Sequence, residues 1–314
     1  MLQFPDAPLA VEPKIPLIAE ETENSTMCLN SECPVSVPPS ARFCPVCGSD
    51  NGCPNVRQAK EEVPSLRERL KKAQLNADRR GCLPRFQDLL ERLKSSVAVI
   101  ATSPNKAHAL LSDPSETYTT FYRVVASGSR TPRSNWFDQV RGIADELLFP
   151  NYREYISFGA LSLDGVGCWH YGSVHLVLAD FAIRDRATVF EENSLLFCYK
   201  NRLGVHQPIP LGYRAQWQHR HELAACKLGP LVDQATATED FPGILLSRST
   251  EAEADFVEVH IYERLNRHSI DRVLVRRYHE KDLGQPDDIE DDEIMNMRIL
   301  RLCQRLGLPC EEVE

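Results

Sequence analysis

The chain has 314 residues, of which 42% are hydrophobic and 26% are charged, and its formal net charge at pH 7 is −9. These proportions are ordinary for a globular protein, and the acidic balance argues against general affinity for nucleic acid over the whole surface, although a local basic patch remains possible. No stretch approaches the ~18 apolar residues that a membrane helix needs, so we expect no membrane segment.

Residues 1–26 combine prolines with acidic and small residues and sustain no hydrophobic period, so we expect an extended, mobile leader. This start lacks the basic and continuous apolar regions of a secretory signal. Single cysteines then recur in apolar or helical contexts, as reduced thiols of a cytoplasmic protein would. They are Cys53, Cys82, Cys168, Cys198, Cys226, Cys303 and Cys310.

Four further cysteines lie close together with the spacing C-x4-C-x10-C-x2-C, namely Cys28, Cys33, Cys44 and Cys47. A Cys-Pro-x-Cys-Gly turn directs two sulfurs at one point, and two such turns supply the four soft ligands that zinc prefers. The segment 27–54 therefore looks like a zinc ribbon. The alternatives are a loop of reduced thiols or two disulfides, and Cys53 could compete as a fifth ligand.

A ribbon of this size cannot bury enough apolar surface to fold alone, so the metal would supply its folding free energy. Ribbons bind nucleic acid, bind protein or only fix a terminus. The cysteines therefore predict a metal site more firmly than they predict a function.

Leucines at helical spacing follow in residues 55–97, interrupted by Gly81 and Pro84. This pattern predicts an antiparallel pair of amphipathic helices. The pair is either a spacer between the ribbon and the main domain or the first packed layer of that domain, and we favour the layer.

Residues 98–280 alternate between strand and helix patterns and indicate an α+β domain, which begins with a short apolar run at 97–101. Strands are expected at 119–125, 156–163, 174–178, 187–190, 243–247 and 255–262. Helices are expected at 136–148, 213–228 and 269–275, with turn or short-helix chemistry at 179–184.

The tail, 281–314, is expected to form an acidic linker and an amphipathic helix at 294–306. The acidic run 286–293 is either a solvated linker or a charge that masks a basic patch of the same chain.

Short motifs of the α+β part, taken together, resemble the mono-ADP-ribosyltransferase-like fold. Residues 121–123 resemble the first strand of that family, 156–162 the second and 256–262 the late strand. Residues 171–178 and 186–194 resemble the middle hairpin of its bacterial toxin-like members. The resemblance implies that the domain binds NAD and modifies a macromolecular target.

The resemblance also implies roles for individual residues. Glu258 would stabilise the oxocarbenium charge that develops when the nicotinamide–ribose bond breaks, and Arg123 would hold the pyrophosphate. Ser157 or Ser162 would supply the ribose-side hydroxyl. Tyrosines of the same motifs would contact the dinucleotide, namely Tyr122 and Tyr171.

The family usually places a Glu or Gln two residues before its catalytic Glu, where this chain has Phe256. His260 could take over the orienting role. The alternative for Glu258 and His260 is an outer polar face of the strand, because both lie opposite Val257 and Val259. The alternative for Arg123 is a surface charge.

A second cluster interleaves basic and aromatic residues, which can clamp phosphate or stack a base. The alternative is an amphipathic helix with a buried tryptophan and solvated basic residues. The cluster comprises His206, Arg214, Trp217, His219, Arg220, His221 and Lys227.

The motifs of P-loop, Rossmann and α/β-hydrolase enzymes are absent, which disfavours those classes. The sequence thus predicts an α+β protein with a zinc ribbon, a helical connector and an NAD-dependent domain, whose target the ribbon recruits. The alternative is a non-enzymatic module in which the ribbon and the 214–227 helix contact nucleic acid or a protein partner.

Overall fold

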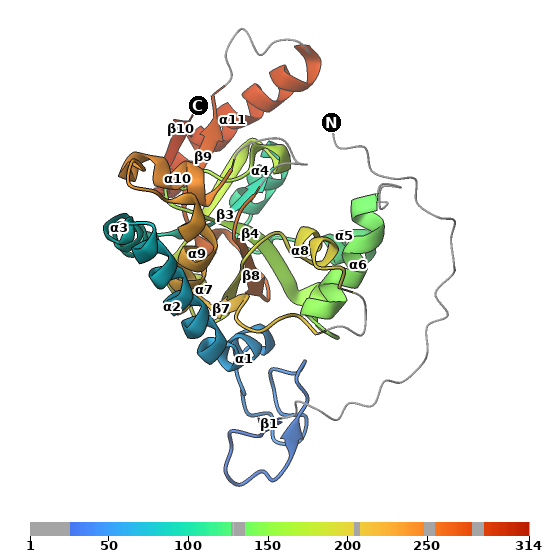
Figure 1. Cartoon of the computed structure of the whole chain (residues 1–314). Helices are drawn as coiled ribbons and strands as arrows, with labels where there is room; N and C mark the ends of the chain where they lie inside the picture. The colour runs from blue at the N-terminus through green and yellow to red at the C-terminus, as the bar shows by residue number, and fades with distance from the viewer. Residues whose placement is uncertain are drawn as a thin grey trace. The chain divides into compact units, whose positions relative to one another are not determined.

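The computed structural model describes residues 26–126, 128, 136–203, 208–247, 255–277 and 286–313. The expected leader therefore lies almost entirely outside the described residues. The chain divides into two compact units, Met1–Asn51 and Gly52–Glu314 (Figure 1). The small unit holds the antiparallel strands β1 (Thr26–Met27) and β2 (Ser36–Val37) and the four clustered cysteines.

The large unit is built on an eight-stranded sheet with the order β10-β9-β5-β3-β4-β8-β6-β7. Among the described strand pairings, that of β10 with β9 is parallel and the others are antiparallel. The strands are β3 (Val97–Thr102), β4 (Ile156–Ser162), β5 (Val174–Leu178), β6 (Ala187–Phe190), β7 (Arg214–Gln216), β8 (Glu258–Tyr262), β9 (Ile270–Arg276) and β10 (Cys310–Val313).

The helices of the large unit connect and cover these strands. They are α1 (Pro54–Glu61), α2 (Val63–Arg79), α3 (Leu83–Leu93), α4 (Pro104–Ser112), α5 (Phe121–Ala126), α6 (Trp136–Leu148), α7 (Asp180–Ile183), α8 (Ser194–Lys200), α9 (Arg220–Leu228), α10 (Phe241–Leu245) and α11 (Pro286–Leu306). Short 3-10 turns are η1 (Arg153–Tyr155), η2 (Trp169–Tyr171), η3 (Trp217–His219), η4 (Gly229–Leu231), η5 (Thr238–Asp240) and η6 (Arg267–Ser269).

The expected helical pair is present as α2 and α3, with α1 before it. A proline stands in the first turn of each of these helices, where its missing N–H costs nothing. Gly81 turns the chain between α2 and α3 with a positive φ of 71°. The pair is a packed layer of the domain, because Leu66 and Phe86 are fully buried in its core.

The two faces of the sheet carry different helices. On one face α2, α3 and α9 cover the core through Leu66, Phe86 and Leu223, while α4 and α11 add Leu111 and Ile299 to the same core. On the other face α6 and α8 enclose a smaller apolar cluster that includes Phe149, Tyr152 and Phe197. In Figure 1, α2 and α3 lie to the left of the sheet and α6 and α8 to the right.

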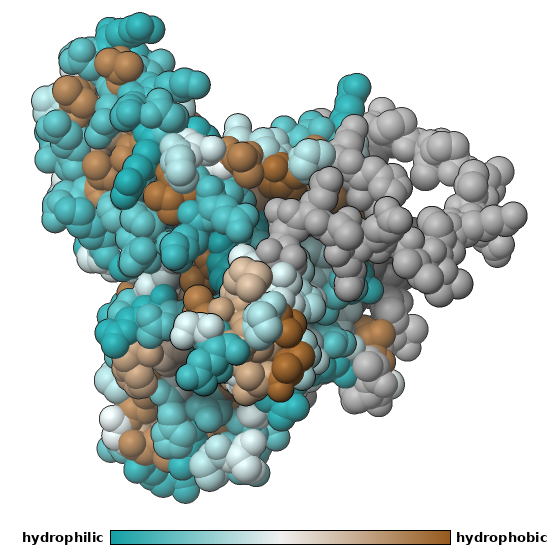
Figure 2. Space-filling model, turned by 90° about the horizontal axis from the view of Figure 1, so that it is seen from below, coloured by the Kyte–Doolittle hydropathy of each residue, from teal (hydrophilic) through white to brown (hydrophobic). Residues whose placement is uncertain are grey.

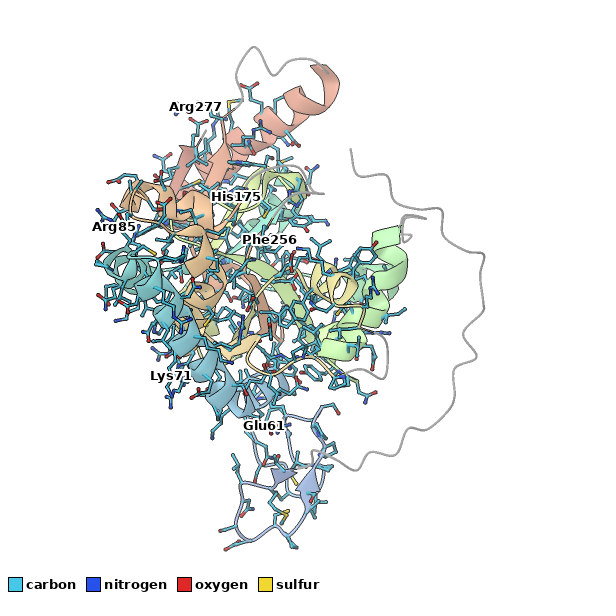
Figure 3. All side chains as sticks on the ribbon, in the orientation of Figure 1. Glu61, Lys71, Arg85, His175, Phe256 and Arg277 are labelled. Atoms are coloured by element: carbon cyan, nitrogen blue, oxygen red, sulfur yellow. The ribbon has the colours of Figure 1, made fainter. Side chains whose placement is uncertain are left out.

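The residues labelled in Figure 3 lie both at the surface and in the interior of the molecule. Figure 3 shows Lys71 on α2 and Arg85 on α3 at the outer side of the molecule, whereas Phe256 lies in its interior. The face seen in Figure 2 is mainly hydrophilic, with apolar residues in small groups. Among the described residues, no helix is both long and apolar enough to cross a membrane.

Several predicted elements are confirmed. The apolar run at 97–101 is β3, and the strand patterns at 156–163, 174–178, 187–190 and 255–262 contain β4, β5, β6 and β8. The helix at 136–148 is α6, and the short-helix chemistry at 179–184 produces α7.

Other predictions are wrong. The expected strand at 119–125 is helix α5, so Tyr122 and Arg123 lie on a helix, and Thr120 ahead of it donates a hydrogen bond to the Glu154 carbonyl at 3.0 Å. The expected strand at 243–247 overlaps α10 instead. The expected short helix at 269–275 is strand β9, in which Val273 and Val275 are fully buried. Packing overrides local propensity in all three places.

The predicted helix at 213–228 is divided into β7, η3 and α9, and the acidic run 286–293 begins helix α11 instead of forming a linker. Helices α4 and α8 and strand β10 were not predicted. Ser103 followed by Pro104 is a helix-start signal that the polar composition of the segment obscured.

Candidate functional site

The central feature of the large unit is a fork in its sheet. The β3–β4 ladder pairs only Val97–Val99 with Ala160–Ser162, whereas the rest of β3 pairs with β5 and the rest of β4 pairs with β8. Beyond Val99 and Ala160 the two strands therefore diverge.

Gly159 stands at the point of divergence. A Cβ atom there would lie 2.8 Å from the Val99 carbonyl oxygen, which is closer than real Cβ atoms approach backbone. Only glycine fits this close approach.

We expect Gly159→Ala to lower the free energy of unfolding by about 1–3 kcal/mol, because β3 or β4 must shift to relieve the contact. Denaturant unfolding measures this change. Gly243→Ala is the matched control, since no atom lies within 4 Å of its Cβ position. Equal unfolding midpoints for the two variants would contradict this account of the fork.

A cavity of about 410 Å³ opens at the fork. Its walls come from the diverging ends of β3 and β4, from the start of α4 and α8, and from the segments before and within α5 and α6. Both aromatic and polar side chains line it, so the cavity can hold both a ring and an anion. The residues that matter for its chemistry are Lys106, Arg141, Asp145, Ser157, Tyr171, Ser194 and Glu258.

Glu258 is the carboxylate in the cavity wall, and only 4% of the residue is exposed. Its Oε2 accepts hydrogen bonds from His260 Nε2 at 2.8 Å and from the Ser194 N–H at 3.0 Å. Within the described residues, no hydrogen bond to Oε1 is formed, so this oxygen is available to a ligand.

His260 is fully buried behind Glu258. Its ring centroid lies 4.8 Å from that of Phe149, 5.4 Å from that of Phe158 and 5.9 Å from that of Phe190. This apolar surrounding fixes the imidazole, which in turn fixes the carboxylate. The alternative of a solvent-facing polar face is wrong for both residues, because the second face of β8 is covered by α6 and α8.

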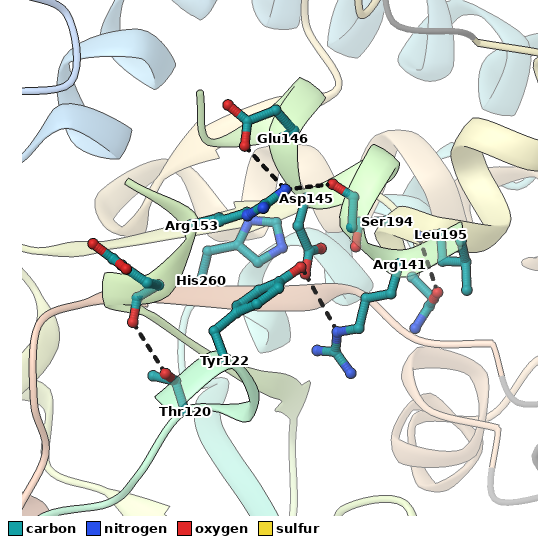
Figure 4. Close-up of polar contacts among 12 residues, drawn as sticks. Thr120, Tyr122, Arg141, Asp145, Glu146, Arg153, Ser194, Leu195 and His260 are labelled. Atoms are coloured by element: carbon teal, nitrogen blue, oxygen red, sulfur yellow. Dashed lines mark hydrogen bonds and ion pairs between the residues drawn. The ribbon is translucent and has the colours of Figure 1, made fainter. Parts of the chain in front are cut away.

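Besides Lys106, the cavity wall contains the cation Arg141, which lies beside Asp145 (Figure 4). Its Nε lies 3.3 Å from Asp145 Oδ2, and its guanidinium lies 4.8 Å from the centre of the Phe158 ring. Burial acts to lower the pKa of Arg141, but the carboxylates of Asp145 and Glu258 outweigh it and raise the pKa above its ordinary value. Arg141 is therefore a permanent cation.

Tyr122 completes this network from α5 by donating a 2.6 Å hydrogen bond to Asp145 Oδ2. Burial and the neighbouring Asp145 carboxylate raise the pKa of the phenol well above its usual range. Tyr122 is thus a neutral donor that holds Asp145 in place.

The other predicted site residues are divided between the cavity and its surroundings. Ser157 and Tyr171 line the cavity, and the Ser157 hydroxyl is buried without a hydrogen-bond partner in the described part of the chain. Ser162 donates to Asp164 Oδ1 and the Val166 carbonyl, both at 3.0 Å, and is not part of the cavity wall. Arg123 lies over the Tyr155 ring at 5.4 Å and also does not line the cavity.

Arg141, Asp145 and Ser194 were not anticipated as site residues. The i, i+4 spacing of Arg141 and Asp145 on a predicted helix was the available signal, because such a pair shares one helix face. Ser194 contacts Glu258 through its backbone N–H, which every residue except proline has, so the residue type at position 194 does not indicate this contact.

Residues of the second cluster, the basic and aromatic one, form hydrogen bonds and ion pairs with other parts of the fold. Trp217 is buried and donates to Asp180 Oδ1 at 2.7 Å, and Arg214 Nε lies 3.8 Å from Glu62 Oε1. Arg220 donates to the backbone carbonyls of Ser96 and Lys94. Lys227 Nζ is 2.5 Å from Asp255, while His206 lies outside the described residues. These contacts favour a structural role for the cluster.

The small unit contains a candidate metal centre. The Sγ atoms of Cys28, Cys33, Cys44 and Cys47 all lie within 4.8 Å of one another, with 3.5 Å between Cys28 and Cys47 and 3.8 Å between Cys33 and Cys44. Four sulfurs about 2.3 Å from a tetrahedral zinc would stand about 3.8 Å apart. The cluster could therefore bind a metal ion such as zinc.

Ser49 and Cys53 follow the four clustered cysteines in the sequence and bear on this metal centre in different ways. Hydrogen bonds between Cys47 and Ser49 lower the pKa of the Cys47 thiol to about 6, which favours the thiolate form that metals bind. Cys53 belongs to the large unit, where it packs in an apolar cluster, and it is not part of the four-thiol group.

No protein-family model matches this sequence, and no curated protein matches it either.

Proposed function

We propose that the large unit is an enzyme that cleaves NAD in the fork cavity and transfers the ADP-ribosyl group to a macromolecular target. The proposal rests on the placement of Glu258. Its buried carboxylate lies in the cavity wall, and His260 and the Ser194 N–H orient one of its oxygens. A fixed carboxylate in a partly dry site stabilises developing positive charge without reorganisation.

The proposed step breaks the bond between the ribose C1′ and the nicotinamide nitrogen. The nitrogen keeps the electron pair and nicotinamide leaves as a neutral molecule, while Glu258 stabilises the oxocarbenium charge through a ribose hydroxyl. A nucleophilic atom of the target then bonds to C1′ and releases its proton to solvent. Water in place of the target would give free ADP-ribose.

Arg141 takes the role that the sequence motif suggested for Arg123. It shares the cavity with Glu258, and its planar guanidinium suits bidentate contact with a phosphate. Ser157 fits the ribose-side role better than Ser162, since the Ser162 hydroxyl is already committed to Asp164 and Val166.

Zinc is the metal that we propose for the four cysteines, because four thiolates with this spacing form a closed structural site. Such a site does not react with substrate. We propose that the ribbon recruits the target, and that the protein works in the cytoplasm, where its free cysteines stay reduced.

One observation favours a second candidate, a non-enzymatic binding module. The small unit exposes large apolar side chains, with Leu29 74% and Val46 69% exposed, and Met27 and Phe43 are also more than half exposed. Apolar groups at this density on a small unit are typical of a protein-binding surface. The second candidate would need no chemistry in the cavity.

Nicotinamide release from NAD by the zinc-loaded full chain, with and without cell lysate, distinguishes the two candidates. Release that increases with lysate, together with label from NAD on a macromolecule, is the expected result. Folded protein that releases no nicotinamide under either condition would overturn the enzymatic proposal and leave the binding module.

We expect Arg141→Gln to raise the KM for NAD by roughly 10- to 100-fold, because a charge-assisted contact to phosphate is lost. Arg123→Gln should change KM by less than about twofold, because Arg123 does not line the cavity and makes no direct contact with a ligand there. Steady-state kinetics of both variants, with thermal unfolding as a check of folding, test this assignment. A larger effect at Arg123 would restore the original motif assignment.

A further inference from the structure

Three arginines form a row along the exposed side of α11: Arg298, Arg301 and Arg305. With about 1.5 Å of rise per residue, the row spans about 10.5 Å, and its members share one helix face. Together with Gln304, and with His108 from the adjacent helix α4, they line a surface groove.

The charge of this row is not balanced inside the protein. Within the described residues none of the three arginines makes an ion pair, whereas Arg42, Arg69 and Arg214 each face a carboxylate. Neighbouring like charges at i, i+3 and i, i+4 destabilise a helix by about 0.2–0.5 kcal/mol per pair. The helix dipole stabilises a cation only in the last turn of a helix, so it explains the presence of Arg305 but not that of Arg298 or Arg301.

The acidic run at the start of α11 does not neutralise the row. It lies on the same helix, 286–306, and a continuous helix cannot fold back on itself. The residues one turn before the arginines are Ile294, Met297 and Arg301, so no carboxylate stands at i−4.

The row is held on a rigid element. Ile299 and Cys303 on the opposite side of α11 are fully buried in the main core. Asn296 Nδ2 donates to the Arg276 carbonyl of β9 at 3.1 Å. The backbone positions of the three arginines are thus held at a fixed spacing, which reduces the ordering cost of binding to that of the exposed side chains.

We propose that this groove binds the sugar–phosphate backbone of a double-stranded nucleic acid. Guanidinium groups match phosphate in geometry and charge, and 10.5 Å corresponds to about three nucleotides of one strand. All five lining side chains are polar, so the groove lacks the apolar pockets by which helices and extended strands of a partner are recognised, and an acidic peptide is the rival ligand that the polyglutamate arm of the test addresses. His108 is the one ring among the five lining side chains, and no phenylalanine, tyrosine or tryptophan is among them, so the groove lacks the row of large aromatic side chains on which single-strand binders stack successive bases.

Helix α4 contributes one residue to this groove and another to the cavity of the fork. His108 lines the groove, whereas Lys106 on the same helix lines the cavity. Residues two apart on a helix point about 200° away from each other, so the groove and the cavity lie on opposite sides of α4. The inference deepens the proposed function by naming a class of target, yet the binding itself requires no NAD chemistry.

The test is fluorescence anisotropy of a labelled DNA duplex of about 20 base pairs with the full chain, between about 50 and 200 mM salt. Three phosphate contacts predict a slope of about −2.7 for log K against log salt, and hence about a 40-fold loss of affinity over this range. Replacing the row by Arg298→Gln, Arg301→Gln and Arg305→Gln should abolish most of the binding and flatten the slope.

The matched control removes three exposed basic residues from α2 by Arg67→Gln, Lys72→Gln and Arg79→Gln, which changes the net charge equally. Retained binding by this control supports the groove. Equal loss in both triple variants, or no binding by the native chain, would overturn the proposal. Tighter binding of polyglutamate or of a single strand than of the duplex would also overturn it. None of these readouts depends on nicotinamide release.

Discussion

Glu258→Gln should lower nicotinamide release from NAD by about 10²–10³-fold while leaving the fold intact. The amide keeps the shape of the carboxylate and its place beside His260 and the Ser194 N–H, but it carries no charge to stabilise an oxocarbenium ion. Because the missing charge matters most in the transition state, kcat should fall more than KM rises. Single-turnover release of nicotinamide measures this effect directly.

Glu68→Gln is the matched control for this variant. Glu68 is an exposed carboxylate on α2 whose partner is Lys71 at 2.7 Å, and its loss should change neither release nor unfolding appreciably. Glu258→Gln protein that unfolds like the native chain and still releases nicotinamide at the native rate would show that Glu258 is not the essential carboxylate.

Removal of the metal should unfold the small unit and leave the large unit folded. Structural zinc contributes about 10–16 kcal/mol of apparent binding free energy in comparable small units. Apart from its cysteines, the small unit buries only one apolar residue, Val37, among the described residues, so little else holds it together. Cys44→Ser should therefore release zinc and make residues 26–51 sensitive to protease.

Cys53→Ser provides the comparison. Its thiol is buried in the large unit and outside the four-thiol group, so the zinc content should stay at the native value. Elemental analysis after dialysis and limited proteolysis of both variants would test this. Unchanged zinc in Cys44→Ser, or lost zinc in Cys53→Ser, would show that the ligand set is wrong.

Much of the secondary structure could be predicted because its signals are local. Alternation in β8 and the helical period of α6 both arise from residues that contact their neighbours along the element. The cysteine cluster could also be predicted, because the ligand spacing is set by two short turns. The errors concern segments whose state is decided by distant partners: β9 forms because β5 and β10 pair with it on both sides.

The candidate site could also be predicted only in part, because contacts with distant parts of the chain decide which residues come together. The sequence singled out Glu258 and His260, yet their burial depends on α6 and α8, which pack against β8 from elsewhere in the chain. For Arg141 the one local signal was its i, i+4 spacing from Asp145, whereas Glu258, with which it shares the cavity, lies far from it in sequence. Arg123 lies outside the cavity wall on helix α5, a helical state that the β-forming residues of 119–125 did not reveal.

The short β3–β4 ladder has a mechanical consequence. Within the described sheet, β10, β9, β5 and β3 form one half and β4, β8, β6 and β7 the other, and their strands join only through the pairs from Val97 to Val99 with Ala160 to Ser162. A small rotation about this joint would widen or narrow the cavity while the ladders of each half stay intact. Such a rotation would be resisted by the apolar core beneath the sheet, because residues of both halves, including Val273 and Val259, belong to it.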